Sequence, residues 1–118
     1  MGTRSVTNIY DGEKLKKNLL VSIYQQMDGY YEGVGKELQR FLTGMTIVNG
    51  FGSNTPEKAA NGMGCLAAQL ISHLKQGIGG VYITSNGEKS EYNYHIFLKD
   101  GQLQLEGTGG DDKKVFSL

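Results

Sequence analysis

The chain has 118 residues, and its twelve basic and twelve acidic side chains give a formal net charge of zero at pH 7. That length suits one domain with a hydrophobic core, so we predict a single domain over residues 1–118. The balanced charge argues against a partner such as a nucleic-acid polymer, whose binding surfaces usually carry a basic excess. The single cysteine, Cys65, excludes an intrachain disulfide and is typical of a reducing cytosol.

The amino terminus has no apolar core of a secretion signal, and no stretch approaches the ~20 apolar residues of a membrane span. We therefore expect a cytoplasmic protein that does not bind a membrane. Glycine is the compositional anomaly, with 18 residues of 118, about twice the usual ~7%. Because these glycines stand singly or in pairs beside many β-forming side chains, they predict tight turns in an ordered domain.

Two strands are predicted first. Residues 3–10 are rich in β-forming side chains and end at Asp11-Gly12, a pair that supplies the positive φ angles of a hairpin turn. The return strand is predicted at Leu19–Gln26, with a polar extension at Glu13–Asn18 before it. Its alternate side chains place an apolar set on one face and a polar set on the other.

Two helices are predicted next. The first, at about 35–43, has an apolar stripe and stops at Gly44. The second has Thr55 as a natural N-cap and Pro56 in the first position, and should run to Gln76. Inside it, Asn61-Gly62-Met63-Gly64 has two glycines that each cost ~1 kcal/mol in a helix interior. Either the helix begins near Asn61, or the glycines permit close approach of a packed neighbour or a ligand. The stripe of the first helix is Val34, Leu38, Phe41 and Leu42.

The rest of the chain predicts a β-meander, with strands at 80–85, 91–98 and 102–105. Turns are expected at Asn86-Gly87 and Asp100-Gly101, and the Gly-rich stretch at about 107–114 should be mobile. Residues 115–118 predict a short docking strand or a contact with a second subunit. The order β-β-α-α-β-β-β predicts an α+β fold, in which an antiparallel sheet of about five strands has two helices packed on one face. An uncovered aromatic face favours a homo-oligomer.

No spacing of residues predicts a metal site or a cofactor, since two histidines and one cysteine do not form a recognisable ligand set. His95 can serve as a general base, and Asp28 with Glu32 can pair as carboxylates, although Asp-Gly is also a common turn. Because no catalytic pair stands at a defined spacing, an enzyme is the second hypothesis.

A binding site is the better supported hypothesis. Arg4 offers a fork suited to phosphate, glutamine and aspartate can contact ribose hydroxyls or a base edge, and tyrosine can stack on a base. The start of the second helix offers free N–H groups to an anion. We expect these groups to converge in one hollow for a phosphate-bearing small molecule. The predicted ligand-binding residues are Arg4, Ser5, Tyr24, Gln26, Asp28, Tyr30, Tyr31, Asn61, Gly62, Met63 and Gly64.

Several motifs resemble those of a group of small, mostly uncharacterised bacteriophage proteins, over about residues 2 to 98. This chain departs from the group at Gln25, where arginine is expected, and at Tyr31, where proline is expected. The motifs are Gly2-Thr3-Arg4-Ser5, Tyr24-x-Gln26-x-Asp28-Gly29-Tyr30-x-x-Gly33-x-Gly35-x-x-Leu38, Asn61-Gly62-Met63-Gly64-Cys65-Leu66-Ala67-Ala68-Gln69-Leu70 and Gly79-Gly80-x-Tyr82.

The resemblance implies a phage protein of the bacterial host cytoplasm. A small, oligomeric phage protein with Arg, Gln and Tyr around a pocket is similar in kind to the sponge proteins that phages use against host immunity. We therefore expect an anti-defence protein that sequesters a nucleotide immune signal, of the cyclic ADP-ribose or cyclic oligonucleotide type. The alternatives are a phosphodiesterase-like enzyme that degrades such a signal and a protein-binding inhibitor of a host defence protein.

Overall fold

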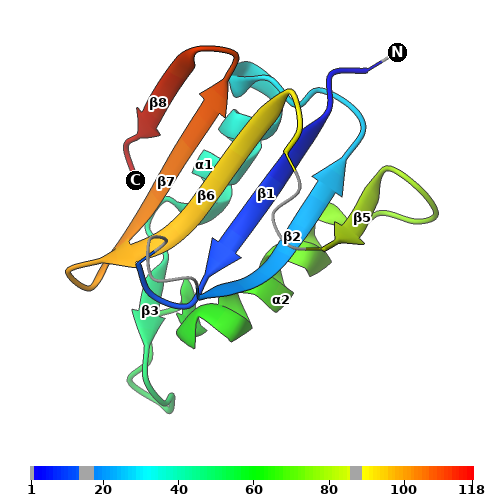
Figure 1. Ribbon diagram of the computed structural model, residues 1–118. Coiled ribbons are helices and arrows are strands. Elements are labelled where there is room, and N and C mark those ends of the chain that lie inside the picture. The colour runs from blue at the N-terminus through cyan, green and yellow to red at the C-terminus, as the bar shows by residue number, and fades with distance from the viewer. Residues whose placement is uncertain (1, 14–17, 86–88) are drawn as a thin grey trace.

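The computed structural model describes residues 2–13, 18–85 and 89–118, and in this part of the chain a six-stranded sheet has two α-helices on one face (Figure 1). The predicted turn at Asn86-Gly87 and the middle of the predicted extension at Glu13–Asn18 lie outside the described residues. The elements are β1 (Ser5–Tyr10), β2 (Leu19–Gln25), the π-helical turn η2 (Tyr31–Gly35), α1 (Lys36–Leu42), β3 (Thr46–Val48), β4 (Ala59–Asn61), α2 (Gly62–Leu74), β5 (Val81–Thr84), β6 (Tyr92–Lys99), β7 (Gln102–Gly109) and β8 (Asp112–Phe116).

The α+β class is as predicted, but the sheet is mixed. Its strand order is β5-β2-β1-β6-β7-β8, and β1 pairs with β6 in parallel whereas the other neighbours are antiparallel. The prediction of an antiparallel sheet of about five strands is therefore wrong at its centre and in its strand count. Parallel strands need a long crossover, and here both helices lie between β1 and β6 in the chain. Such a long-range pairing leaves no signal in the local turn residues.

The core lies between the sheet and the helices, and strand alternation decides which side chains enter it. On β6, Tyr94 and Ile96 are fully buried, on the face that their spacing predicts. The apolar stripe of the first helix is also confirmed, since Val34, Leu38 and Leu42 are buried. Local periodicity thus identified the core of both layers.

The second helix begins later than its capping signals predict. α2 starts at Gly62, which has a φ of +85°, because Ala59–Asn61 forms β4 and pairs in parallel with β3. The hydroxyl of Thr55 instead accepts the backbone N–H of Gly52 at 2.7 Å. The Thr55-Pro56 pair therefore belongs to a loop, and the alternative of a start near Asn61 is confirmed.

Residues 107–114, predicted to be a mobile segment without strands, belong mostly to the β7–β8 hairpin. β7 continues to Gly109 because two tyrosine rings lie over its glycines. A Cβ on Gly107 would lie 3.0 Å from the Tyr94 ring, and a Cβ on Gly109 would lie 2.3 Å from the Tyr92 ring. The hairpin returns as β8, which buries Phe116 in the core.

Replacing Tyr94 with phenylalanine tests how much the fold depends on one buried hydroxyl. This hydroxyl donates to the carbonyl oxygen of Gly29 at 2.6 Å. Its removal leaves a buried carbonyl unpaired, so Tyr94→Phe should lower the free energy of unfolding by about 1–3 kcal/mol in urea denaturation at pH 7. Tyr82→Phe is the matched control, since Tyr82 is 45% exposed, and it should change that free energy by less than ~0.5 kcal/mol.

The same variant predicts a pH dependence. Burial, with smaller contributions from Tyr31 and Tyr92, raises the pKa of Tyr94 above its ordinary value of 10.0. Above pH ~10 the Tyr94 hydroxyl of the unfolded chain loses its proton, while that of the folded protein keeps it. The stabilising contribution is therefore complete below pH ~10 and is lost as the pH rises further. The urea midpoint of the parent protein should fall more steeply above pH ~10 than that of Tyr94→Phe, and equal slopes would contradict this assignment.

Candidate functional site

The passage from β2 into α1, which carries the predicted site residues Asp28, Tyr30 and Tyr31, is a tightly packed junction. Asp28 has a left-handed φ of +57°, and its carbonyl oxygen accepts the N–H of Val34 at 2.7 Å. The N–H of Gly29 donates to the carbonyl of Thr3 at 2.9 Å, which ties the junction to the segment before β1. A Cβ on Gly33 would lie 2.1 Å from the carbonyl oxygen of Asp28. Packing of the backbone on itself therefore requires glycine there.

The two tyrosines of this junction have different surroundings. Tyr30 is exposed, and its hydroxyl donates to Oδ1 of Asp28 at 3.1 Å, the main cause of its raised pKa. Tyr31 instead packs edge-on against the rings of Tyr92 and Phe116, at centroid distances of 5.2 and 6.0 Å. Tyr31 therefore stabilises the fold, whereas Tyr30 is open to a ligand.

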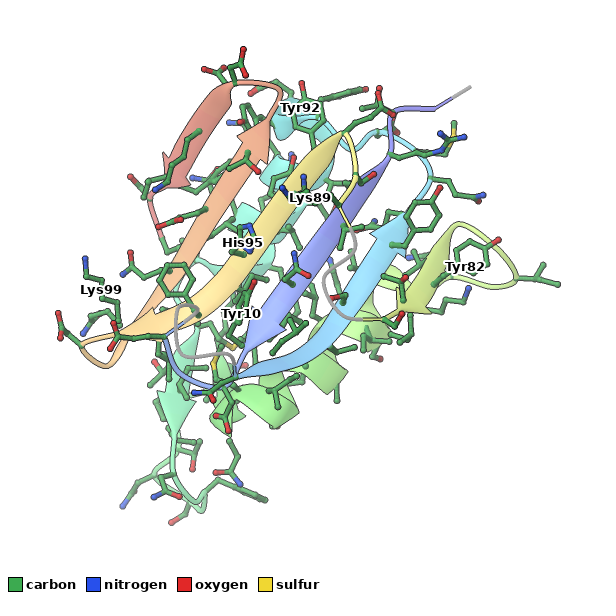
Figure 2. All side chains as sticks on the ribbon, viewed as in Figure 1. Tyr10, Tyr82, Lys89, Tyr92, His95 and Lys99 are labelled. Carbon is green, nitrogen blue, oxygen red and sulfur yellow. The ribbon has the colours of Figure 1, made fainter. Side chains whose placement is uncertain are left out.

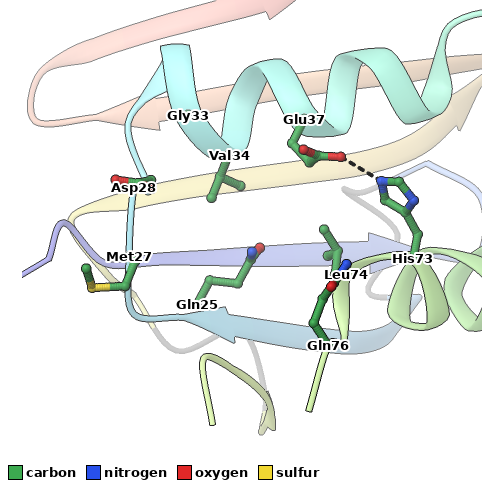
Figure 3. A pocket seen from close by; sticks show the side chains of 9 residues that line it. All are labelled: Gln25, Met27, Asp28, Gly33, Val34, Glu37, His73, Leu74 and Gln76. Carbon is green, nitrogen blue, oxygen red and sulfur yellow. Dashed lines mark hydrogen bonds and ion pairs between the residues drawn. The ribbon is translucent and has the colours of Figure 1, made fainter. Parts of the chain in front are cut away.

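Asp28 lines a pocket of about 370 Å³ on the helix side of the sheet, which we call the interhelix pocket (Figure 3). Across it, Oε2 of Glu37 on α1 lies 2.6 Å from Nε2 of His73 on α2. The ring of Phe41 lies 5.1 Å from the His73 ring and supports it. His73 is in the last turn of α2 and bridges the two helices through Glu37. The lining residues are Gln25, Met27, Asp28, Gly33, Val34, Glu37, His73, Leu74 and Gln76.

Three buried polar atoms on this side of the sheet have no hydrogen-bond partner within the described ranges: Oγ of Ser5, Oγ1 of Thr7 and Oε1 of Gln25. Ser5 and Gln25 are cross-strand partners, so their side chains point to the same, helix-covered face. Since most buried polar atoms in proteins are satisfied, such a group needs an explanation. Of the predicted site residues, Ser5 thus lies inside the protein, on the helix side.

The opposite face of the sheet has a second hollow, of about 490 Å³, which we call the open-face hollow. It contains Arg4 and Tyr24, two residues of the predicted site, and the ring of Tyr24 lies 6.0 Å from that of Tyr82. Figure 2 shows Tyr82 and Lys89 on this face, away from the helices. The sequence analysis missed Lys89. The lining residues are Arg4, Val6, Tyr24, Thr84, Lys89, Ser90 and Glu91.

The open-face hollow has two cationic groups, Arg4 and Lys89. The side chains of Arg4 and Lys89 are exposed, and neither forms an ion pair with any residue that the structure describes. Glu91, the acid of the same hollow, accepts the backbone N–H of Arg4 through Oε1 at 3.1 Å. The hollow therefore combines two available cations with an aromatic ring.

His95, the predicted general base, also lies on the open face (Figure 2). Its Nδ1 is 3.0 Å from the hydroxyl of Tyr10, and partial burial raises the pKa of Tyr10. Among the described residues, the lining of the open-face hollow does not include His95. The structure thus gives His95 a hydrogen-bond partner, Tyr10, on the open face of the sheet.

The start of α2, predicted to complete the hollow, lies elsewhere. Asn61 accepts the N–H of Gly50 through Oδ1 at 2.7 Å, and Met63 is buried in the core. It is the other end of the helix, at His73, that lines the interhelix pocket with Asp28. The helix is 13 residues long, which corresponds to about 20 Å. Within one chain, the prediction of a single hollow is therefore wrong.

The remaining predicted site residues are Gly62, Gly64 and Gln26. A Cβ built on Gly62 or Gly64 has no atom within 4 Å. Gln26 is exposed just after β2, and its N–H donates to the carbonyl oxygen of Gly80.

Sequence reasoning missed the groups that the fold brings together from distant segments. Glu37 and His73 stand 36 positions apart on two helices, and no local pattern pairs them. Gln25 was interpreted only as a departure from an expected arginine. Its place three positions before Asp28 in the sequence was the one available sign that the two lie near each other. Lys89 follows the predicted turn, so only the pairing of β1 with β6 shows that it lies near Arg4.

No family model, curated protein or solved structure matches this chain. Within the residues described, no group of three or more His, Cys, Asp and Glu side chains is placed to hold a metal ion. No helix in the same residues is long and apolar enough to cross a membrane. The geometry of the two hollows therefore carries the functional argument.

Two glycine substitutions separate packing from ligand contact. In Gly33→Ala the new Cβ would meet the Asp28 carbonyl at 2.1 Å, so the junction must shift, and we expect a loss of about 2–4 kcal/mol of unfolding free energy. Gly64→Ala is the control, because a Cβ there meets nothing within 4 Å, and it should raise stability by up to ~1 kcal/mol. Urea denaturation measures both. Equal effects of the two variants would contradict the packing role of Gly33.

Proposed function

We propose that this chain binds a small phosphate-bearing molecule of the nucleotide kind in the open-face hollow. The observation that carries this proposal is the meeting of Arg4 and Lys89 beside the ring of Tyr24. Neither cation has an ion-pair partner in the described part of the protein. Exposed cations that are left available in a concave site favour an anionic ligand, and the ring adds a surface for a base.

Each lining group has a distinct role in this proposal. The guanidinium of Arg4 matches two phosphate oxygens with a planar fork, and Lys89 adds a flexible ammonium. Tyr24 stacks on the base, and the carboxylate of Glu91 accepts hydroxyl groups such as those of a ribose. The volume of about 490 Å³ lies within the roughly 300–1,000 Å³ that is usual for small-molecule sites.

The resemblance to small bacteriophage proteins extends the proposal to a biological role. We propose that the ligand is a nucleotide immune signal, of the cyclic ADP-ribose or cyclic oligonucleotide type, which the protein sequesters in the cytoplasm of the bacterial host. The chemistry of the hollow supports retention over turnover. Among its described lining residues Glu91 is the one carboxylate, and none is a histidine or a cysteine.

Degradation of the same signal is the second candidate. The observation that favours it is His95, the predicted general base, which lies on the same face of the sheet with Nδ1 3.0 Å from the hydroxyl of Tyr10. A binding protein releases its ligand intact on heat denaturation, whereas a phosphodiesterase releases a cleaved product. The third candidate is an inhibitor that acts on a host protein. It would bind neither cyclic ADP-ribose nor a cyclic oligonucleotide.

Binding to the open-face hollow is predicted to need both cations. In calorimetric titration with cyclic ADP-ribose, and then with a cyclic dinucleotide, Arg4→Ala and Lys89→Ala should each raise Kd about tenfold. Lys99→Ala is the control, at the opposite end of the same face (Figure 2), and should leave Kd unchanged. Asp28→Asn should also leave Kd unchanged, because Asp28 lies in the other pocket.

Two results would overturn this function. One is the absence of binding to both nucleotides, and the other is an unchanged Kd in both cation variants. Recovery of a cleaved nucleotide from the heated complex would show that the protein degrades the signal and does not sequester it. Each variant should keep the urea midpoint of the parent protein, since both side chains are exposed.

The proposal includes a homo-oligomer, for which the edge strand β5 is the best surface. Ile83 on this strand is 60% exposed, and Ile78 just before it is fully exposed. An exposed apolar edge strand is suited to pairing with a second copy. Light scattering should show a lower mass for Ile83→Lys than for the parent protein. Phe51→Lys, which changes a residue that is 78% exposed in a distant loop, should keep the parent mass, and a monomeric parent would contradict the prediction.

A further inference from the structure

The interhelix pocket is negatively charged whichever protonation state His73 takes. Asp28 and Glu37 each supply a carboxylate, and among the described lining residues His73 is the one group that can carry a positive charge. Two carboxylates against at most one cation leave a net negative charge. The last turn of α2, which carries His73 and Leu74, adds the negative end of a 13-residue helix. The pocket therefore favours a cation.

The amide oxygen of Gln25 is an independent sign of a ligand. This oxygen is buried, and it has no hydrogen-bond donor in the part of the chain that the structure describes. Figure 3 shows the side chain rising from β2 toward the space between Val34 and Leu74. Its cross-strand partner Ser5 is completely buried and also has an unpartnered hydroxyl. A buried acceptor without a donor is unfavourable, so the pocket favours an occupant that brings N–H groups.

Three of the remaining lining residues, Met27, Val34 and Leu74, are apolar and can contact a hydrocarbon chain, and Gln76 adds a second amide. Val34 is buried, Leu74 is half-buried, and Met27 is exposed at the end of the pocket nearest Asp28 (Figure 3). A metal ion is a poorer match, because the described residues contain no cluster of three ligating side chains. A charged head with N–H donors and a short alkyl chain matches Asp28 and Gln25 on one side and Val34 and Leu74 on the other.

We propose that the interhelix pocket binds a small aliphatic primary amine. Its ammonium group donates to the carboxylate of Asp28 and the amide oxygen of Gln25, and its chain lies against Val34 and Leu74. This site is separate from the open-face hollow, because Tyr24 and Gln25 are consecutive on β2 and point to opposite faces of the sheet. The inference stands whether or not the protein binds a nucleotide.

Three probes of equal length test the chemistry of the site. Backbone amide shifts of the isotope-labelled protein would be followed by NMR at pH 7 during titration with butylamine, butanol and butyrate. Butylamine should saturate and shift the amides of Gln25, Asp28 and Leu74, because it is the one probe with both the positive charge and the donors. Shifts of equal size with butanol or butyrate, or no shift at these residues with butylamine, would overturn the proposal.

Variants separate a binding role from a structural one. Asp28→Asn keeps a residue type that tolerates the left-handed backbone and should raise the Kd for butylamine about tenfold. Gln25→Met should do the same while raising the thermal midpoint, since it removes a buried unpaired acceptor. Glu32→Gln, outside this pocket, and Arg4→Ala should leave the Kd unchanged. An unchanged Kd in both Asp28→Asn and Gln25→Met would overturn the site, and the Asp28 variant decides alone if the other does not fold.

Discussion

The parallel pairing of β1 with β6 positions both candidate sites. Parallel strands begin at the same end of a sheet, so the start of β1 lies beside the start of β6. There the N–H of Tyr92 donates to the carbonyl of Arg4 at 3.2 Å. One step further along β6, the hydroxyl of Tyr94 reaches Gly29 on the helix side. The same pairing therefore brings Arg4 to the segment that carries Lys89 and anchors the junction that carries Asp28.

Strand alternation then gives the two hollows opposite charges. Tyr24 faces the cations of the open-face hollow, while Gln25, the next residue, faces the carboxylates of the interhelix pocket. Because a side chain can serve only one face of a strand, the two sites draw on different residues of the same short segments. The described lining residues of the two sites do not overlap, so the two sites can differ in chemistry within a small domain.

Features set by neighbouring residues were predictable, and features set by distant ones were not. The stripe at Val34, Leu38 and Leu42 and the burial of Tyr94 follow from periods of 3.6 and 2. The parallel pairing at the sheet centre closes a connection of more than eighty residues, and no turn signal marks it. The helix start predicted at Thr55-Pro56 is wrong for a related reason. The pairing of β4 with β3 is a tertiary contact, and it holds Ala59–Asn61 extended where local propensity favours a helix.

Glycines close together in a loop are a weak sign of a ligand, as the junction between β2 and α1 shows. A Cβ on Gly29, Gly33 or Gly35 would meet backbone or core atoms at 2.7, 2.1 and 2.9 Å, so these glycines serve the protein's own packing. A better sign of a ligand is a polar group whose needs the fold leaves unmet. The oxygen of Gln25 is such a group inside the protein, and the guanidinium of Arg4 is one at the surface. A ligand of the first group would supply hydrogen-bond donors and a ligand of the second would supply negative charge, so the two proposals require different ligands.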